Sequence, residues 1–340
     1  MKPLPDVEIS YKPLYDIVRN PIAARLLMAG IELGIFDALE EFHPAENIAA
    51  ALHTHPANTR RFLDALATIG LVEKRTGRFR NRPLAATFLV TSSPVYVGTQ
   101  LNGVEQMCVK PLADLPAMIR SGPGLATGAP DISSEALWAE ATRASAAWVT
   151  TGEVGTKMAA MLAELPEFPG FRRMLDLGGG HGMFTLYFVQ AHPEMTGVVF
   201  DRPAVVSVAE EFIKKYDMES RVSVMAGDYL TDSIGGGYDL IWACSTLNFA
   251  LPDIDPLVTK VFDALNPGGL FIAFQDGLTH EGTRPEVMLG FLAETMRLDR
   301  DFSFRQGQIA DAMLRCGFRS VRSHTIRTAM EEMDLDIARK

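Results

Sequence analysis

A glycine-rich segment carries the first residues whose types and spacing point to chemistry. The run DLGGGHG at residues 176–182 follows an apolar stretch typical of a β-strand and precedes a helical pattern. In α/β proteins ligands bind at the carboxyl ends of strands, and glycine lets a ligand approach the backbone closely. Asp176, Gly178 and Gly180 therefore predict a ligand-binding turn. A dinucleotide fingerprint requires a further glycine where this chain has Met183, so the pattern disfavours NAD.

Polar residues also stand at the ends of three further predicted strands. Asp201 ends GVVFD, Asp228 and Tyr229 follow RVSVMAG, and Cys244 precedes Ser245 at the end of YDLIWACS. Because the carboxyl ends of parallel strands meet at one edge, we expect these side chains to reach one crevice. Asp201 lies 21 residues after Gly180, where a carboxylate accepts the ribose hydroxyls of an adenosine. We expect Asp228 to accept the adenine amino group and Tyr229 to offer its ring face to the base.

The surrounding patterns predict an α/β fold with a doubly wound, mostly parallel sheet over residues 169–340. Its strands alternate with helices such as HGMFTLYFVQAH and LVTKVFDAL, and QIADAMLRCGFRSVRSHTI predicts one more helix and strand. Residues 1–95 show helical spacing and then a turn-linked hairpin in LVEKRTGRFRNRPLAATF, which is typical of a winged helix. Residues 96–168 predict a helical linker and lid, interrupted by a Gly/Pro-rich loop at 121–131.

Composition narrows the class of protein. With 340 residues and 47% hydrophobic content, the chain is long enough for two domains. Its net charge of −10 disfavours nucleic acid and anionic membranes as partners and favours a small molecule. The sequence has no secretory signal pattern and no long apolar run, so we expect a cytoplasmic protein. Cys108, Cys244 and Cys316 are widely spaced, which predicts free thiols and no metal site.

The segments LDLGGGHG, FDRPAVV, GDYL and LNPGGLFIAFQDG resemble the plant-type small-molecule O-methyltransferases, and the likeness covers nearly the whole chain. Bacterial members of that family share an N-terminal winged-helix dimerisation domain. The resemblance implies a Rossmann-like catalytic domain, S-adenosylmethionine (SAM) as cofactor, a homodimer, and metal-independent methyl transfer to a small molecule. The predicted cofactor contacts are Asp176, Gly178, Gly180, Asp201, Asp228, Tyr229 and Cys244.

At one position the chain departs from the family it resembles. That family places a general-base histidine after the fourth strand, ordinarily in Leu-His-Asp-Trp, whereas this chain reads LNFA with Asn248 in its place. An asparagine side chain has no basic site, so a phenol with a pKa of about 10 would lack its usual activation.

Three explanations of Asn248 remain open: another base acts, the chain is an inactive SAM-binding scaffold, or the nucleophile has no proton to lose. The third favours S-methylation of a thioether acid and a likeness to the 4-methylthio-2-hydroxybutyrate S-methyltransferases of dimethylsulfoniopropionate synthesis. O-methylation of a phenol or other hydroxyl and C-methylation are the alternatives.

Several other side chains are candidates for catalysis or acceptor binding. His280 is the candidate replacement base, and His181 lies beside the predicted cofactor. The candidate acceptor contacts are Trp138, Trp148, Met158, Glu294, Arg297 and Arg300. An arginine among them would grip a substrate carboxylate with two parallel hydrogen bonds. Core packing, a dimer interface or a solvated helix face would explain the same residues without a substrate.

A DNA-binding regulator is the main alternative from another class. Residues 51–90 contain seven Lys or Arg against two acidic residues, within the segment that resembles a winged helix. The cofactor-contact residues of the second half favour the enzyme instead and disfavour nucleic acid as a partner.

Overall fold

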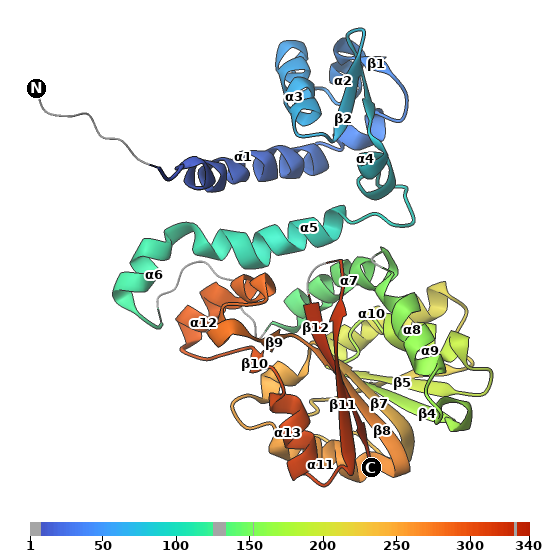
Figure 1. Cartoon of the computed structure of the whole chain (residues 1–340). Coiled ribbons are helices and arrows are strands. Elements are labelled where there is room, and N and C mark those ends of the chain that lie inside the picture. The colour runs from blue at the N-terminus through green and yellow to red at the C-terminus, as the bar shows by residue number, and fades with distance from the viewer. Residues whose placement is uncertain (1–7, 125–133, 152, 330–331) are drawn as a thin grey trace, which may run out of the picture. The chain divides into compact units, whose positions relative to one another are not determined.

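The computed structural model describes residues 8–124, 134–151, 153–329 and 332–340 (Figure 1). The chain forms two compact units, Met1–Asn102 and Gly103–Lys340. Most of the loop predicted at 121–131 lies outside the described residues.

The first unit is a small helical domain with a short antiparallel sheet. Its described strands pair in the order β1-β3-β2, and β2 and β3 form the predicted hairpin around Thr76 and Gly77. Phe36, Leu63 and Phe79, each at most 1% exposed, lie in its core. The elements are α1 (Lys12–Glu32), η1 (Ile35–Ala38), β1 (His43–Pro44), α2 (Ala45–Ala51), α3 (Pro56–Thr68), β2 (Val72–Arg75), β3 (Arg78–Asn81) and α4 (Pro83–Phe88), and α5 (Gly98–Val104) crosses into the second unit.

The second unit begins with helices and continues as alternating strands and helices. The helical part comprises η2 (Glu105–Val109), η3 (Lys110–Asp114), α6 (Leu115–Ser121), α7 (Glu135–Thr151), α8 (Val154–Ala163) and η4 (Phe168–Gly170). The alternating part comprises β4 (Arg173–Leu177), α9 (Met183–Ala191), β5 (Thr196–Asp201), α10 (Pro203–Lys215), β6 (Val222–Ala226), β7 (Tyr238–Cys244), η5 (Leu247–Ala250), α11 (Asp255–Ala264) and β8 (Leu265–Gln275). It ends with β9 (Gly277–Leu278), η6 (His280–Gly282), η7 (Glu286–Phe291), α12 (Leu292–Leu298), β10 (Phe304–Arg305), α13 (Gln308–Arg315), β11 (Ser320–Arg327) and β12 (Glu332–Arg339).

A seven-stranded sheet, counted over the described residues, organises this unit in the order β11-β12-β8-β7-β4-β5-β6. Strands β4 to β8 run parallel, whereas β12 pairs antiparallel with β8 and β11 antiparallel with β12. The prediction of a mostly parallel α/β sheet is confirmed, as are the last predicted helix and strand, which are α13 and β11. Strand β12 was not predicted.

Alternating side chains along the parallel strands build two cores, one on each face of the sheet. Met174 and Leu240 face the core shared with α8, α9 and α10, whereas Leu175 and Ile241 face the core shared with α11 and α13. Strands buried on both faces are expected when helices cover both sides of a parallel sheet. This packing holds the carboxyl ends of β4, β5, β7 and β8 along one rigid edge.

Helix α1 presents an unusual apolar surface. Leu14, Tyr15, Val18 and Ile22 are between 58% and 75% exposed, and the structure buries only Gly30 of this fully described helix. Among the described residues no helix combines the length and apolar character needed to cross a bilayer. An exposed stripe of large apolar side chains marks an association surface. The homodimer implied by the sequence resemblance would bury it against a second copy.

We therefore predict that a Leu14→Glu/Val18→Glu double variant is monomeric while the wild type is dimeric, because two carboxylates would have to be buried in the interface. Light scattering coupled to size-exclusion chromatography measures the mass of each. Leu314→Glu, which alters an equally apolar, 50% exposed side chain on α13, is the matched control and should remain dimeric. A dimeric double variant would exclude α1 from the interface.

Candidate functional site

The glycine-rich turn after β4 adopts a backbone that other residues rarely take. Gly178, Gly180 and Gly182 have φ values of +63°, +55° and +70°. A Cβ atom on Gly178 would lie 2.1 Å from Oγ1 of Thr246, which follows β7. The turn therefore requires glycine both for its left-handed conformation and for its close approach to the loop after β7.

Asp201 joins the end of β5 to this turn. Its Oδ2 accepts a hydrogen bond of 2.9 Å from the backbone N–H of Gly180, and its Oδ1 accepts one of 2.7 Å from the N–H of Arg202. Burial raises the pKa of Asp201, and the two amide donors oppose that shift. Each carboxylate oxygen keeps a lone pair for a further donor. The carboxylate thus lies where the sequence placed it, and its contact with a ribose stays a prediction.

Asp176 is a buried carboxyl group near the end of β4. It is 1% exposed, and its Oδ2 accepts a hydrogen bond of 2.8 Å from the hydroxyl of Thr185. Its Oδ1 is buried and has no partner among the described residues. Burial raises the pKa of Asp176 to about 7, against the stabilising effect of the Thr185 hydroxyl. A cationic ligand would favour the ionised form, and SAM, with its sulfonium and ammonium groups, fits that requirement.

Asp228 and Tyr229, in the loop after β6, differ in exposure. Asp228 is exposed, and its Oδ1 accepts a 2.9 Å hydrogen bond from the N–H of Leu230. Tyr229 is only 8% exposed, and its hydroxyl donates to the backbone oxygen of Thr246 at 2.7 Å. Tyr229 therefore ties the loop after β6 to the loop after β7. The contact of its ring face with a base stays a prediction.

The end of β7 brings a thiol close to two carboxyl groups. Cys244 is the last residue of β7, and its Sγ lies 3.8 Å from Oγ of Ser245. Burial raises the pKa of the Cys244 thiol, which Asp176 and Asp276 raise further and the Ser245 hydroxyl lowers. The thiol is thus kept protonated and is a poor nucleophile. Asp276 directly follows β8 and lies within electrostatic reach of the Cys244 thiol.

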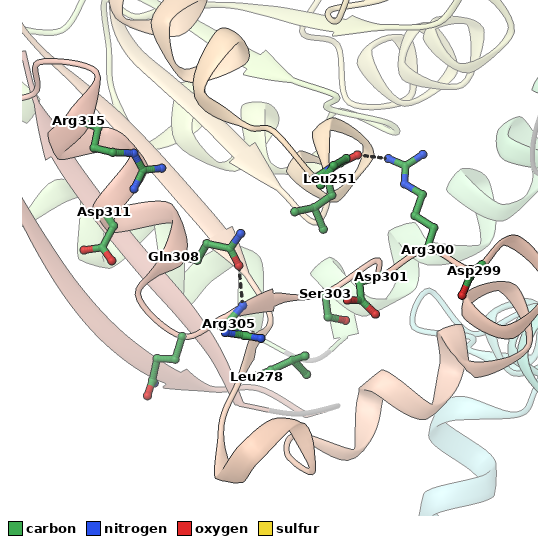
Figure 2. Close-up of a pocket in the computed structure, with 12 residues that line it drawn as sticks. Leu251, Leu278, Asp299, Arg300, Asp301, Ser303, Arg305, Gln308, Asp311 and Arg315 are labelled. Carbon is green, nitrogen blue, oxygen red and sulfur yellow. Dashed lines mark hydrogen bonds between the residues drawn. The ribbon is translucent and has the colours of Figure 1, made fainter.

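Asn248 lies in the short helix η5 after β7. It is 4% exposed, and its Oδ1 is buried without a partner among the described residues. Nη2 of Arg300 donates to the backbone oxygens of Phe249 and Leu251, both at 2.8 Å, and Figure 2 shows the contact with Leu251. The ring of Phe249 meets Trp138 of α7 edge to face, with centroids 5.5 Å apart. Arg300 therefore holds the Asn248 segment, and its Nη2 is not free for a substrate carboxylate.

A surface cavity of ≈690 Å³ lies beside this segment (Figure 2). It is lined by charged and polar side chains of both signs, including Arg300, Arg305 and Asp311, and by Leu251. None of the predicted cofactor contacts lines it. The cavity is therefore separate from the residues gathered at the strand ends.

The two candidate histidines have other contacts. His181 is 7% exposed, and its Nδ1 accepts a 3.1 Å hydrogen bond from the N–H of Met183 at the start of α9. Burial lowers the pKa of His181 to about 4, so the ring is neutral. His280 is exposed, with Nδ1 3.0 Å from Oγ1 of Thr279. His181 thus supports a helix, and the role of His280 as a base stays a prediction.

The candidate acceptor contacts separate into core and edge residues. Met158 is 1% exposed and packs in the core with α9. Trp148 stacks on Phe274 with centroids 6.3 Å apart, and its Nε1 is buried without a partner among the described residues. Arg297 pairs with Glu294 at 2.6 Å within α12, so its guanidinium is already held by a carboxylate. Of these four, Trp148 has a buried donor and Glu294 a buried acceptor, Oε1, that lack a partner within the described part of the chain.

Helix α7 packs against the edge formed by the carboxyl ends of the strands, a contact that the sequence did not predict. Oε2 of Glu135 accepts a 3.0 Å hydrogen bond from the N–H of Ala204, just after β5. The guanidinium of Arg202 lies 5.7 Å from the Trp138 ring centroid, and a Cβ on Gly180 would lie 3.1 Å from Thr142. Thr142 and Thr246 carry no sequence signal. Asp276 does, since FQDG repeats the pattern of a carboxylate directly after a strand.

We predict that Asp176→Asn removes a pH-dependent loss of stability. Between the ordinary pKa of 3.8 and the folded value of about 7, the folded chain binds a proton at Asp176 that the unfolded chain has lost, so rising pH destabilises the wild type. The free energy of unfolding of the variant, relative to that of the wild type, should therefore rise by up to about 1.4 kcal/mol per pH unit in this window. Denaturant unfolding of both proteins across the window measures the difference, with the exposed Asp263→Asn as control. A gain that does not change with pH would contradict the shifted pKa.

No group of three or more His, Cys, Asp or Glu side chains within the described residues is arranged to hold a metal ion.

Comparison with known proteins places these residues in a family. Residues 144–298 match the model of the O-methyltransferase domain, and residues 16–91 match that of the O-methyltransferase dimerisation domain, which supports a homodimer. The 3-hydroxy-5-methyl-1-naphthoate 3-O-methyltransferase of Streptomyces sahachiroi is 30% identical over 75% of this chain and 74% of its own length. The N,N-dimethyltransferase OxyT of Streptomyces rimosus is 28% identical over 74% of each chain.

The fold agrees with these sequence matches. The crystal structure of human N-acetylserotonin methyltransferase in complex with SAM superposes with a TM-score of 0.79 over 99% of both chains, at 22% identity. The Rossmann-like catalytic fold and the helical dimerisation domain are thus both confirmed. The chain belongs to the O-methyltransferase family and is a methyltransferase.

Proposed function

We propose that the chain transfers a methyl group from SAM to a small-molecule acceptor whose nucleophilic atom needs no general base at position 248. The observation that carries the proposal is Asn248, buried and without a basic site where the family has a histidine. When bound, SAM supplies an electrophilic methyl group on a sulfonium. The protein then has to position the acceptor and exclude water, and both tasks are met by packing and hydrogen bonds.

The cofactor-binding residues are those gathered at the strand ends. Gly178 and Gly180 allow close approach to the backbone, and Asp201 accepts the ribose hydroxyls. Asp228 accepts from the adenine amino group, and Asp176 offsets positive charge. In this proposal Tyr229 and Cys244 complete the contact surface.

Acceptors that need no base include a thioether sulfur and a neutral amine, since each attacks through a free lone pair. The thioether acid 4-methylthio-2-hydroxybutyrate is therefore one candidate. The ion pair between Arg297 and Glu294 weakens its support, because the arginine proposed to grip its carboxylate is already neutralised. A neutral amine has the support of OxyT, whose name gives it as an N,N-dimethyltransferase.

O-methylation is the second candidate, because the relative from Streptomyces sahachiroi is named a 3-O-methyltransferase. A hydroxyl acceptor would have to arrive ionised or lose its proton to another side chain, such as His280. The family histidine, restored at position 248, should then increase the rate.

We predict that Asn248→His leaves the kcat/KM of the preferred acceptor within about threefold of the wild type, because base-free transfer has no proton for the new histidine to remove. The assay is mass-spectrometric detection of S-adenosylhomocysteine (SAH) and methylated product. The acceptors are 4-methylthio-2-hydroxybutyrate, a catechol, and N-methylaniline. Asn248→Gln, which changes size without adding a base, is the control for altered packing.

A gain of roughly 10²-fold or more with the catechol alone, within the usual range of general-base catalysis, would replace the base-free proposal with O-methylation. SAM binding without turnover of any acceptor would indicate a scaffold.

A further inference from the structure

Asp276 is a buried carboxylate for which the described residues offer one partner and leave one oxygen unused. It directly follows β8 and is 8% exposed. Its Oδ1 accepts a hydrogen bond of 2.7 Å from Nε2 of Gln275. Its Oδ2 is buried and has no partner within the described residues. A buried polar group without a partner costs free energy comparable to a lost hydrogen bond, so a ligand donor is expected there.

Gln275 adds a second unused acceptor beside the first. It is 3% exposed, and its Oε1 is also buried without a partner in the described part of the chain. The orientation of this amide is determined by chemistry, since only its NH₂ group can donate to the Asp276 carboxylate. Two adjacent buried oxygens, Oδ2 of Asp276 and Oε1 of Gln275, thus lack hydrogen-bond donors within the described residues. They favour a ligand bearing N–H or O–H groups and disfavour a carboxylate.

These oxygens lie at the same edge as the cofactor residues, but at a different strand end. The sheet order β8-β7-β4-β5 puts Asp276 two strands from the glycine-rich turn and three from Asp201. The backbone N–H of Ser245 donates to the oxygen of Phe274 at 3.0 Å, and Trp148 of α7 stacks on the Phe274 ring. A ligand at Asp276 would therefore lie beside aromatic side chains and the end of β7, and an adenosine on Asp201 would leave that place open.

We propose that Asp276 and Gln275 bind the methyl acceptor, and that the acceptor is an arylamine whose neutral nitrogen donates its N–H to Oδ2 of Asp276. This inference rests on the proposed function and deepens it by naming the acceptor class.

The chemistry follows from the movement of charge. The nitrogen lone pair forms the N–C bond while the C–S bond breaks, and the pair from that bond stays on sulfur to give SAH. The N–H hydrogen remains on nitrogen, which becomes an ammonium, and the proton leaves to solvent after transfer. The carboxylate binds the developing ammonium more strongly than the neutral amine, so it stabilises the transition state selectively. No general base is needed, which accounts for Asn248.

The test uses N-methylanilines, each paired with its phenol and its methylthio analogue. Arylamines are neutral near neutral pH, so the three nucleophiles differ without a change in charge. We expect the wild type to turn over the amine best in each set. Asp276→Asn should lower the kcat/KM of the amine at least tenfold, the size of a lost hydrogen bond to a charged group (about 1.5–3 kcal/mol).

Calorimetric binding supplies a readout besides activity. Asp276→Asn should weaken binding of N-methylaniline to the SAH complex at least tenfold and leave the affinity for SAM unchanged. Asp334→Asn is the matched control. Asp334 lies opposite Gln275 in the sheet, but its Oδ1 already accepts from Gln306 at 3.2 Å and Thr325 at 3.1 Å, so both affinities should stay at the wild-type value. If Asp276→Asn does not fold, Gln275→Leu tests the same site.

The possible failures are distinguishable. Unchanged amine binding by both Asp276→Asn and Gln275→Leu, preference for the phenol or methylthio partner, or a weakened affinity for SAM would overturn the inference and leave methyl transfer standing. No SAH formation by the wild type with any acceptor would overturn the proposed function, and the inference with it.

Discussion

The hydrogen bond from the backbone N–H of Gly180 to the carboxylate of Asp201 is the contact on which the arrangement of the site depends. It joins the turn after β4 to the end of β5, and it is available because Gly180 takes a left-handed conformation. On the other side of the same turn, Gly178 leaves room for the side chain of Thr246. The backbone oxygen of Thr246 accepts a hydrogen bond from the hydroxyl of Tyr229. A few short contacts therefore connect the loops after β4, β5, β6 and β7, and the parallel sheet holds those loops at one edge.

The chemistry of that edge is set by buried carboxyl groups that the described residues leave without enough hydrogen-bond donors. Asp176 has a pKa raised to about 7 by burial, and Asp276 leaves one oxygen without a partner. Such groups raise the free energy of the ligand-free folded protein, and ligands that carry positive charge or develop it during reaction would lower it again. SAM carries positive charge, and the amine acceptor proposed above would develop it. In this view the absence of a histidine at position 248 reflects charge placement rather than lost catalysis.

The sequence predicted those features that depend on neighbouring residues. The strands, the glycine turn and the position of Asp201 follow from local patterns that repeat at each strand end, and the structure has them at the expected places. Contacts between elements that are distant in the sequence could not be predicted from local patterns. The hold of Arg300 on the Asn248 segment and the core position of Met158 depend on how α8 and the segment after α12 pack, whereas Arg297 and Glu294 pair locally, three residues apart on α12. Strand β12 was missed although residues 332–337 alternate acidic and apolar side chains, a pattern typical of a half-buried strand.

The most direct test of the account is the calorimetric dissociation constant of SAH for the wild type and for Asp201→Ala. The account predicts one site per chain in the wild type and a loss of at least about tenfold in affinity in the variant, since hydrogen bonds to a charged group contribute roughly 1.5–3 kcal/mol. Wild-type protein that does not bind SAH, or a variant that binds it equally well, would contradict the placement of the cofactor at the ends of β4 and β5.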